Sequence, residues 1–155
     1  MTRNHRLKTQ VRAQQAAAGV PYSVARRRVT SALAEVMQEH PLLSNFGIGV
    51  FDAHRKTTEQ RRDELEEGRA ILAGREAVIF DTVAWLRDNV TPIKTPAVSS
   101  YGMKHVMERT IGVYTTNGEF IAAALIAGYS FKYARPNVLF GMSARDVSRL
   151  RVAAH

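Results

Sequence analysis

The sequence predicts a mainly α-helical protein that carries one small β-hairpin. Apolar residues recur at helical spacing over most of the 155 residues. Thr57 and Thr116 are each followed three residues later by Gln or Glu, the capping-box pattern of a helix start. From Tyr129 to Ala134, aromatic residues alternate with Ser, Lys and Ala, which is the strand period. These observations predict about six helices and one hairpin.

Residues 1–41 are expected to form two helices joined by a tight turn. The first helix should run from Asn4 to Ala18 and end at Gly19, a residue free to take a positive φ. The second should run from Val24 to Glu39, with Ser23 as its N-cap. One face of this helix is apolar and therefore predicted to be buried: Tyr22, Ala25, Val29, Leu33 and Val36.

The rest of the chain divides into a linker or short strand over 42–56 and a helical core over 57–155. Helices are expected over Thr57–Ala73, 75–90, Ser100–Ile111 and Thr116–Ala127, and from Ser143 onward. An extended segment covers 91–99, and the hairpin covers 129–142. From residue 75 onward this is the element order of a winged-helix domain, so a winged-helix-like unit is predicted on topology alone.

Charge is segregated along the chain and indicates a polyanionic partner. The net charge is +8, and residues 1–30 hold seven Lys or Arg and no acidic residue. Residues 31–89 have a net charge of −4, and residues 90–155 have +5. A segregated excess of this kind is typical of nucleic-acid binding. The alternative is that the basic ends dock on the acidic middle of the same chain.

Composition excludes several function classes. Cysteine is absent, so disulfides and thiolate metal sites are ruled out. The longest apolar run, Phe120–Gly128, is too short to span a bilayer, and no secretory signal opens the sequence. We therefore expect a cytoplasmic protein without a membrane partner. No phosphate-binding loop, dinucleotide fingerprint or nucleophile elbow is present, and no cofactor is expected.

The segment AAAGVPYSVARRRV (16–29) resembles the helix-turn-helix motif of lac-type repressors. Gln15 and Arg28 depart from that motif, because a small and an aliphatic residue are usual there. The resemblance implies a recognition helix whose base-facing residues are Ser23, Arg26 and Arg27. Phosphate contacts are expected from the remaining basic residues of the arm and from the hairpin: Arg3, Arg6, Lys8, Arg12, Lys132 and Arg135. A helix pair packed on the acidic middle, or one bound to a membrane or partner helix, is the alternative.

The helix that would read DNA in a winged-helix unit has the wrong composition for that task. NGEFIAAALIAG (117–128) carries Phe, Ile, Leu and Ala in place of groove-reading polar side chains. Such a helix is either buried or packed on a second subunit. If the Phe120–Leu125 segment is exposed, a homodimer is expected, since operators commonly pair two half-sites.

The main alternative to a nucleic-acid-binding protein is an enzyme. His105 and Glu108 lie three residues apart on one predicted helix, and a His tuned by a carboxylate can act as general base in phosphodiester cleavage. This would make the protein a small nuclease or a toxin-like enzyme. The competing interpretation is a solvated polar helix face. Asp52, His54 and His40 offer only two or three scattered metal ligands, too few for a predicted metal site.

A second resemblance lies in the C-terminal half. The segment SSYGMKHVMERTIGVYTTNGEFIAAALIAGY, within Pro92–Met142, resembles uncharacterised small proteins of plasmids, phages and other mobile elements. The resemblance implies a mobile-element setting and no mechanism. The predicted function is therefore a DNA-binding accessory or regulatory protein of a mobile element, with RNA as the other nucleic acid considered. A non-catalytic inhibitor or adaptor that binds a host protein is the third alternative.

Overall fold

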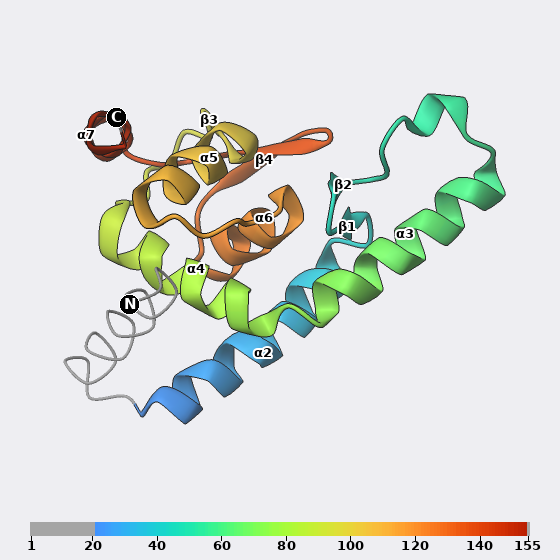
Figure 1. Cartoon of the computed structure of the whole chain (residues 1–155), viewed down its shortest axis with the longest axis horizontal. Helices are drawn as coiled ribbons and strands as arrows, with labels where there is room; N and C mark the ends of the chain where they lie inside the picture. Colours follow the sequence, from blue (N-terminus) through green and yellow to red (C-terminus); the bar gives the residue numbers. More distant parts are fainter. Residues whose placement is uncertain (1–20, 155) are drawn as a thin grey trace.

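The computed structural model describes residues 21–154. The predicted first helix, Gly19 and four of the predicted phosphate contacts lie outside these residues: Arg3, Arg6, Lys8 and Arg12. The described part is mainly helical and has two small antiparallel sheets (Figure 1). Among the described residues, no helix combines the length and the apolar character that a membrane span requires.

The helices are α2 (Tyr22–Glu39), α3 (Thr58–Ala73), α4 (Glu76–Asn89), α5 (Ser100–Ile111), α6 (Asn117–Ile126) and α7 (Ala144–Ala153), with a short 3₁₀ helix η1 (Ala53–Arg55). Strands β1 (Leu43–Ser44) and β2 (Gly47–Ile48) pair antiparallel in the segment predicted to be a linker or short strand. Strands β3 (Val98–Ser99), β4 (Phe131–Ala134) and β5 (Asn137–Phe140) form a sheet in the order β3-β5-β4. The predicted hairpin is thus confirmed as β4–β5.

Helix α6 lies at the centre of the fold. Phe120 and the four residues that follow it are completely buried, and α6 packs against α2, α4 and α5 (Figure 1). The sequence left open whether this apolar helix is buried or packs on a second subunit. It is buried, because other elements of the same chain cover it. The ground for expecting a homodimer, an exposed Phe120–Leu125 helix, therefore no longer applies. The element order predicted from residue 75 is present, while the winged-helix assignment itself stays a prediction.

The prediction that Ser23 is the N-cap of α2 is wrong. The N-cap is Pro21, whose carbonyl accepts hydrogen bonds from the N–H groups of Val24 (3.1 Å) and Ala25 (3.0 Å). Ser23 therefore lies inside the first turn, with its side chain exposed rather than capping. A proline with extended ψ can precede a helix directly, since its missing N–H is not needed there. The predicted apolar face is confirmed: Ala25, Val29, Leu33 and Val36 are buried, and Tyr22 packs against the core.

Thr57 and Thr116 are the N-caps of α3 and α6, as the sequence predicts. Thr57 and Gln60 form the complete capping box of α3. Thr116 accepts a hydrogen bond from the N–H of Glu119 (3.1 Å), but the second half of that box is missing. The Glu119 carboxylate is buried and instead lies 3.6 Å from Nε of Arg75, at the start of α4.

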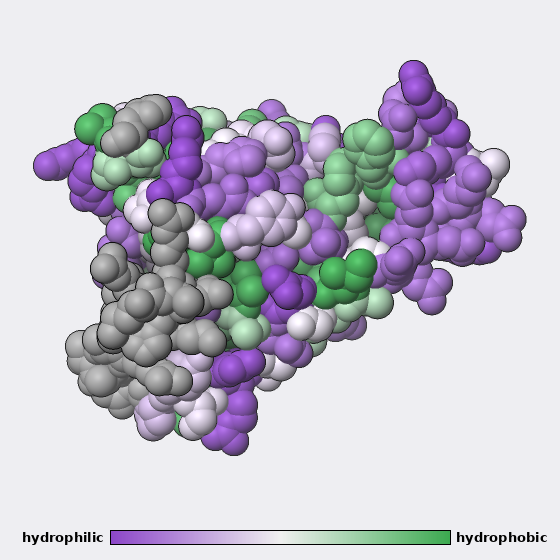
Figure 2. All heavy atoms as spheres, in the orientation of Figure 1, coloured by the Kyte–Doolittle hydropathy of each residue, from purple (hydrophilic) through white to green (hydrophobic). Residues whose placement is uncertain are grey.

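Surface polarity is uneven on the face drawn in Figure 2. The end formed by η1 and the first turns of α3 is almost wholly hydrophilic, whereas hydrophobic atoms reach the surface near the middle of the molecule (Figure 2). Exposed apolar or aromatic residues include Phe46, Ile71, Tyr101 and Tyr114. These four residues line a common pocket, which is described below.

His40 joins the end of α2 to strand β4. Its imidazole is buried, Nδ1 is hydrogen-bonded to the Tyr133 hydroxyl, and the ring packs edge-on against Phe131 with centroids 5.2 Å apart. Burial disfavours the charged imidazolium and lowers the pKa of His40 below 6.5, although the neighbouring Glu39 carboxylate acts in the opposite direction. The folded protein therefore prefers a neutral His40.

We expect the free energy of unfolding to fall as the pH decreases below 6.5. In that range the unfolded chain binds a proton at His40 that the folded chain resists, so protonation favours unfolding until the pH passes the folded pKa. Urea denaturation at a series of pH values between 7.5 and 5 would measure this loss. In a His40→Gln variant the loss should be reduced, whatever its effect on stability at pH 7.5. An unchanged pH dependence in that variant would contradict the assignment to His40.

Candidate functional site

The first candidate site is the exposed surface of the first two turns of α2, which carries three consecutive arginines. Arg26, Arg27 and Arg28 are all exposed, and within residues 21–154 none of them forms an ion pair. No acidic residue lies in the first turn of the helix. These three positive charges are thus not neutralised by the acidic middle of the chain.

The opposite side of α2 is fixed to the core. Helix α2 packs against α4 and α6 through its buried residues. Its carboxyl end is held by Arg69 of α3, whose guanidinium donates to the carbonyl oxygens of Met37 (2.7 Å) and His40 (2.9 Å). A cation at a helix C-terminus also compensates the macrodipole. The arginines are therefore presented on a helix that is anchored at its side and at its end.

Lys132 and Arg135 do not join this arginine group. Lys132 lies on β4, Arg135 lies at the turn of the hairpin, and both are exposed. Strand β4 meets α2 at its carboxyl end, through the His40–Tyr133 contact. Arg27 is twelve residues, or about 18 Å of helix, before Glu39. The structure therefore places the two predicted groups of basic residues at different ends of α2.

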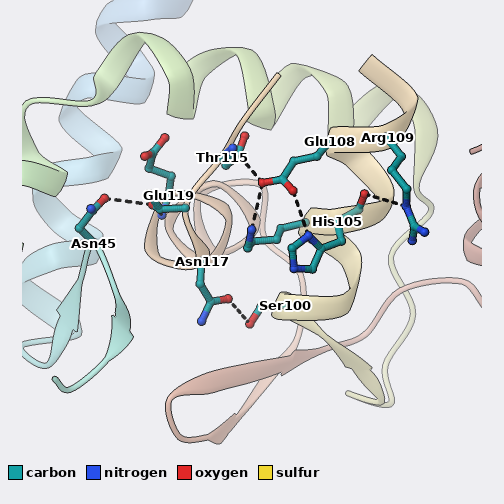
Figure 3. A network of polar contacts seen from close by, with 10 residues as sticks. Asn45, Ser100, His105, Glu108, Arg109, Thr115, Asn117 and Glu119 are labelled. Carbon is teal, nitrogen blue, oxygen red and sulfur yellow. Dashed lines mark hydrogen bonds and ion pairs between the residues drawn. The ribbon is translucent and has the colours of Figure 1, made fainter. Parts of the chain in front are cut away.

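The second candidate site is a pocket of about 800 Å³ between α3 and α5. Its remaining walls are the β1–β2 turn, the segment that enters α6, and the turn of the β4–β5 hairpin. The polar network at its floor is drawn in Figure 3. These walls come from residues 45–71 and 101–137, so the pocket exists only once the chain has folded.

His105 and Glu108 meet in this region, as their spacing predicts. Nδ1 of His105 lies 3.0 Å from Oε2 of Glu108, and Oε1 accepts hydrogen bonds from Nζ of Lys104 (2.9 Å) and the N–H of Thr115 (3.0 Å) (Figure 3). Burial alone would raise the pKa of Glu108. The hydrogen bonds from Thr115, Lys104 and His105 and the charge of Lys104 outweigh burial and hold this pKa below 4.5. Glu108 is thus ionised at neutral pH.

When the His105 ring is neutral, the ionised Glu108 fixes its tautomer. A carboxylate can only accept hydrogen bonds, so Nδ1 of His105 must carry the proton that it donates. Nε2 is then left as an acceptor. His105 lines the pocket and its side chain is 41% exposed, so this acceptor is accessible to a ligand.

Within residues 21–154, the surroundings of this pair do not favour phosphodiester cleavage. Lys104 is bound to Glu108, and the opposite wall carries the uncompensated carboxylate of Glu67, which repels phosphate. The nearby Ser100 hydroxyl is buried and occupied, since it donates to Oδ1 of Asn117 (2.9 Å) and accepts from the N–H of Val138 (3.1 Å). The geometry therefore favours a structural role for Glu108, which ties α5 to the segment before α6.

His40 does not join Asp52 and His54 to form a metal site. His54 and Asp52 are 3.6 Å apart on an exposed loop, whereas His40 is buried against Tyr133. In the part of the chain that the structure describes, no three His, Asp or Glu side chains gather around a common point that could hold a metal ion.

Sequence reasoning missed the pocket as a unit. The sequence placed His105 and Glu108 on one helix, but it did not indicate that Lys104 lies near the rings of both Tyr101 and Tyr114. The α3 residues that line the pocket precede those of α5 by about forty residues in the sequence. No local sequence pattern indicates that the two helices line one pocket. The available signal was the set of aromatic residues, Phe46, Tyr101 and Tyr114, which no predicted apolar helix stripe includes.

Comparison of the chain with protein-family models, with curated proteins and with solved structures finds no match. The resemblance of Pro92–Met142 to proteins of mobile elements therefore stays a prediction. A functional proposal rests on the two candidate sites themselves.

Proposed function

We propose that this protein binds nucleic acid, and double-stranded DNA in preference to RNA. The contact surface is the first two turns of α2, which carry Arg26, Arg27 and Arg28. The observation that carries the proposal is the exposure of Arg26, Arg27 and Arg28 without an ion pair in residues 21–154. Arginine is suited to both phosphate and guanine, because its planar fork donates in pairs. An accessory or regulatory role on a mobile element is the setting that we propose for this binding.

The placement of the arginines on α2 supports a groove contact. In helix-turn-helix proteins the amino-terminal turns of the recognition helix reach the base edges. Ser23, Arg26 and Arg27 lie in the first two turns of α2 and are exposed. The buried opposite side gives the helix a fixed orientation, which base readout requires. Lys132 and Arg135 are proposed as flanking phosphate contacts.

The proposal assigns no reading role to α6. This helix would occupy the recognition position of a winged-helix unit, but Phe120 and the residues after it are buried in the core. A buried helix cannot enter a DNA groove. DNA binding therefore depends on α2 whether or not the C-terminal half adopts a winged-helix arrangement.

A salt titration of the intact protein tests this proposal. We expect binding to a fluorescently labelled 30-base-pair duplex at 50 mM salt, measured by anisotropy. If three or four phosphates are neutralised, affinity should fall about 40- to 150-fold between 50 and 200 mM salt. A single-stranded RNA of equal length would show whether the duplex is preferred. Absence of binding at 50 mM salt, or binding that salt does not weaken, would overturn the proposal.

A further inference from the structure

The wall of the pocket formed by α3 is acidic. Glu64 and Glu67 both line the pocket. Lys56 compensates Glu64, with Nζ 2.6 Å from Oε2. Glu67 forms no ion pair with any residue between 21 and 154, and its side chain is exposed. One uncompensated carboxylate therefore faces the pocket, which repels anionic ligands and attracts cations.

The wall formed by α5 and the segment after it is aromatic. Tyr101 and Tyr114 line the pocket and are 53% and 73% exposed. Nζ of Lys104 lies 5.5 Å from the centre of the Tyr101 ring and 5.3 Å from that of Tyr114. The chain thus already uses these rings to stabilise a cation. Because so much of each tyrosine is exposed, ring surface remains for a second, external cation.

Three of the hydrogen-bond donors that line the pocket are used inside the protein. Nζ of Lys104 donates to Glu108, Oγ1 of Thr116 donates to Asn45 (3.0 Å), and Nδ2 of Asn117 donates to Oδ1 of Asn137 (3.0 Å). By contrast, the Glu67 carboxylate and Nε2 of His105 are acceptors for which the structure gives no partner in residues 21–154. A ligand that matches this pocket supplies donors and a positive charge.

We propose that the pocket between α3 and α5 binds the guanidinium group of an arginine side chain on a partner polypeptide. A guanidinium has five N–H donors and no acceptor, stacks on aromatic rings and pairs with carboxylates in two parallel hydrogen bonds. Glu67 offers the carboxylate, Tyr101 and Tyr114 offer the rings, and all three line the pocket. The Lys104–Glu108 pair is neutral as a whole and does not oppose this cation.

The size and charge of the pocket favour a polypeptide over a nucleic acid. About 800 Å³ is at the upper part of the range of ligand pockets and accommodates an arginine side chain with the backbone that carries it. A nucleotide would bring its phosphate against the acidic wall. The inference is independent of DNA binding by α2. If both hold, the protein is an adaptor that connects a nucleic acid on α2 to an arginine-bearing protein at the pocket.

An NMR titration of the full-length protein with the peptide acetyl-Gly-Arg-Gly-amide tests the proposal. We expect saturable shifts of the amide signals of Tyr101, His105 and Tyr114. The matched peptide with citrulline in place of arginine keeps the shape but lacks the charge, and should bind at least about fivefold more weakly. Adenosine monophosphate serves as the nucleotide probe and should cause no saturable shift at these residues.

Two substitutions on α3 locate the site. Glu67→Gln removes the uncompensated charge and should weaken peptide binding about fivefold or more. Glu66→Gln removes an equal charge from the neighbouring exposed residue, which does not line the pocket, and should change binding less than about twofold. Equal effects of the two variants, equal binding of the citrulline peptide, or absence of saturable shifts would overturn the proposal. Saturable binding of adenosine monophosphate at the same residues would replace it with a nucleotide site.

Discussion

Replacing Gly118 by alanine is expected to remove a third or more of the stability of the fold. Gly118 is the second residue of α6 and is buried against the β1–β2 turn, where its N–H donates to the carbonyl of Asn45 (3.2 Å). A Cβ atom at this position would lie 1.8 Å from the carbonyl oxygen of Ser44 and 2.8 Å from Cα of Asn45. These atoms are backbone and cannot move away as the end of a side chain can. The turn and the helix would have to separate.

The separation would expose the buried surface between α6 and β1–β2, at the centre of the core. Overpacking commonly costs about 1–3 kcal/mol, and a clash with backbone belongs at or above the upper end of that range. A domain has about 5–15 kcal/mol in total. We expect a midpoint of urea denaturation lowered by a third or more, or no cooperative transition at all.

Gly102→Ala is the matched control. Gly102 lies in α5, and a Cβ atom there would meet nothing within 4 Å. Alanine is a better helix residue than glycine, so this variant should be about 0.5–1 kcal/mol more stable than the parent. The two substitutions are chemically identical and are expected to act in opposite directions. A Gly118→Ala protein that denatures at the same urea concentration as the parent would show that α6 does not approach the β1–β2 turn this closely.

The contrast between Gly118 and Gly102 illustrates what could be predicted from the sequence. Local patterns predicted the ends of α5 and the capping box of α3, because a cap involves residues three positions apart. The close approach of Gly118 to Ser44 joins residues 74 positions apart in the sequence, and no periodicity indicates which of several glycines touches another backbone. The sequence showed that α6 is apolar. It did not show that the remaining elements cover it.

The two candidate sites also differ in whether the sequence could predict them. The exposed side of α2 could be predicted because burial of one helix face dictates which residues lie on the other. The pocket could not be predicted, because it joins Glu67 of α3 to Tyr101 and Tyr114, and pairs of this kind depend on how helices pack. The assignment of Ser23 as N-cap was wrong for a local reason. Pro21 already supplies the extended residue before the helix, so the first turn begins earlier.

Replacing Arg26 and Arg27 together by alanine is expected to weaken binding to duplex DNA more than about tenfold, since each contact with phosphate or a base edge contributes about 1 kcal/mol or more. Both side chains are exposed and form no ion pair in residues 21–154, so their loss leaves the core of the protein intact. Alanine also has the highest helix propensity. The circular dichroism spectrum and the urea midpoint should therefore stay close to those of the parent.

The salt dependence separates a specific contact from a general effect of charge. If both arginines contact phosphate, their loss should reduce the slope of log affinity against log salt by about 2; if they contact base edges, their loss should instead relax the sequence preference. Arg145→Ala with Arg151→Ala is the control, because it removes two exposed arginines from α7 and changes the net charge equally. This control should weaken binding less than about threefold and keep the slope, since screened charges far from the contact contribute little. Equal losses in the two double variants would mean that net charge, and not the surface of α2, holds the DNA.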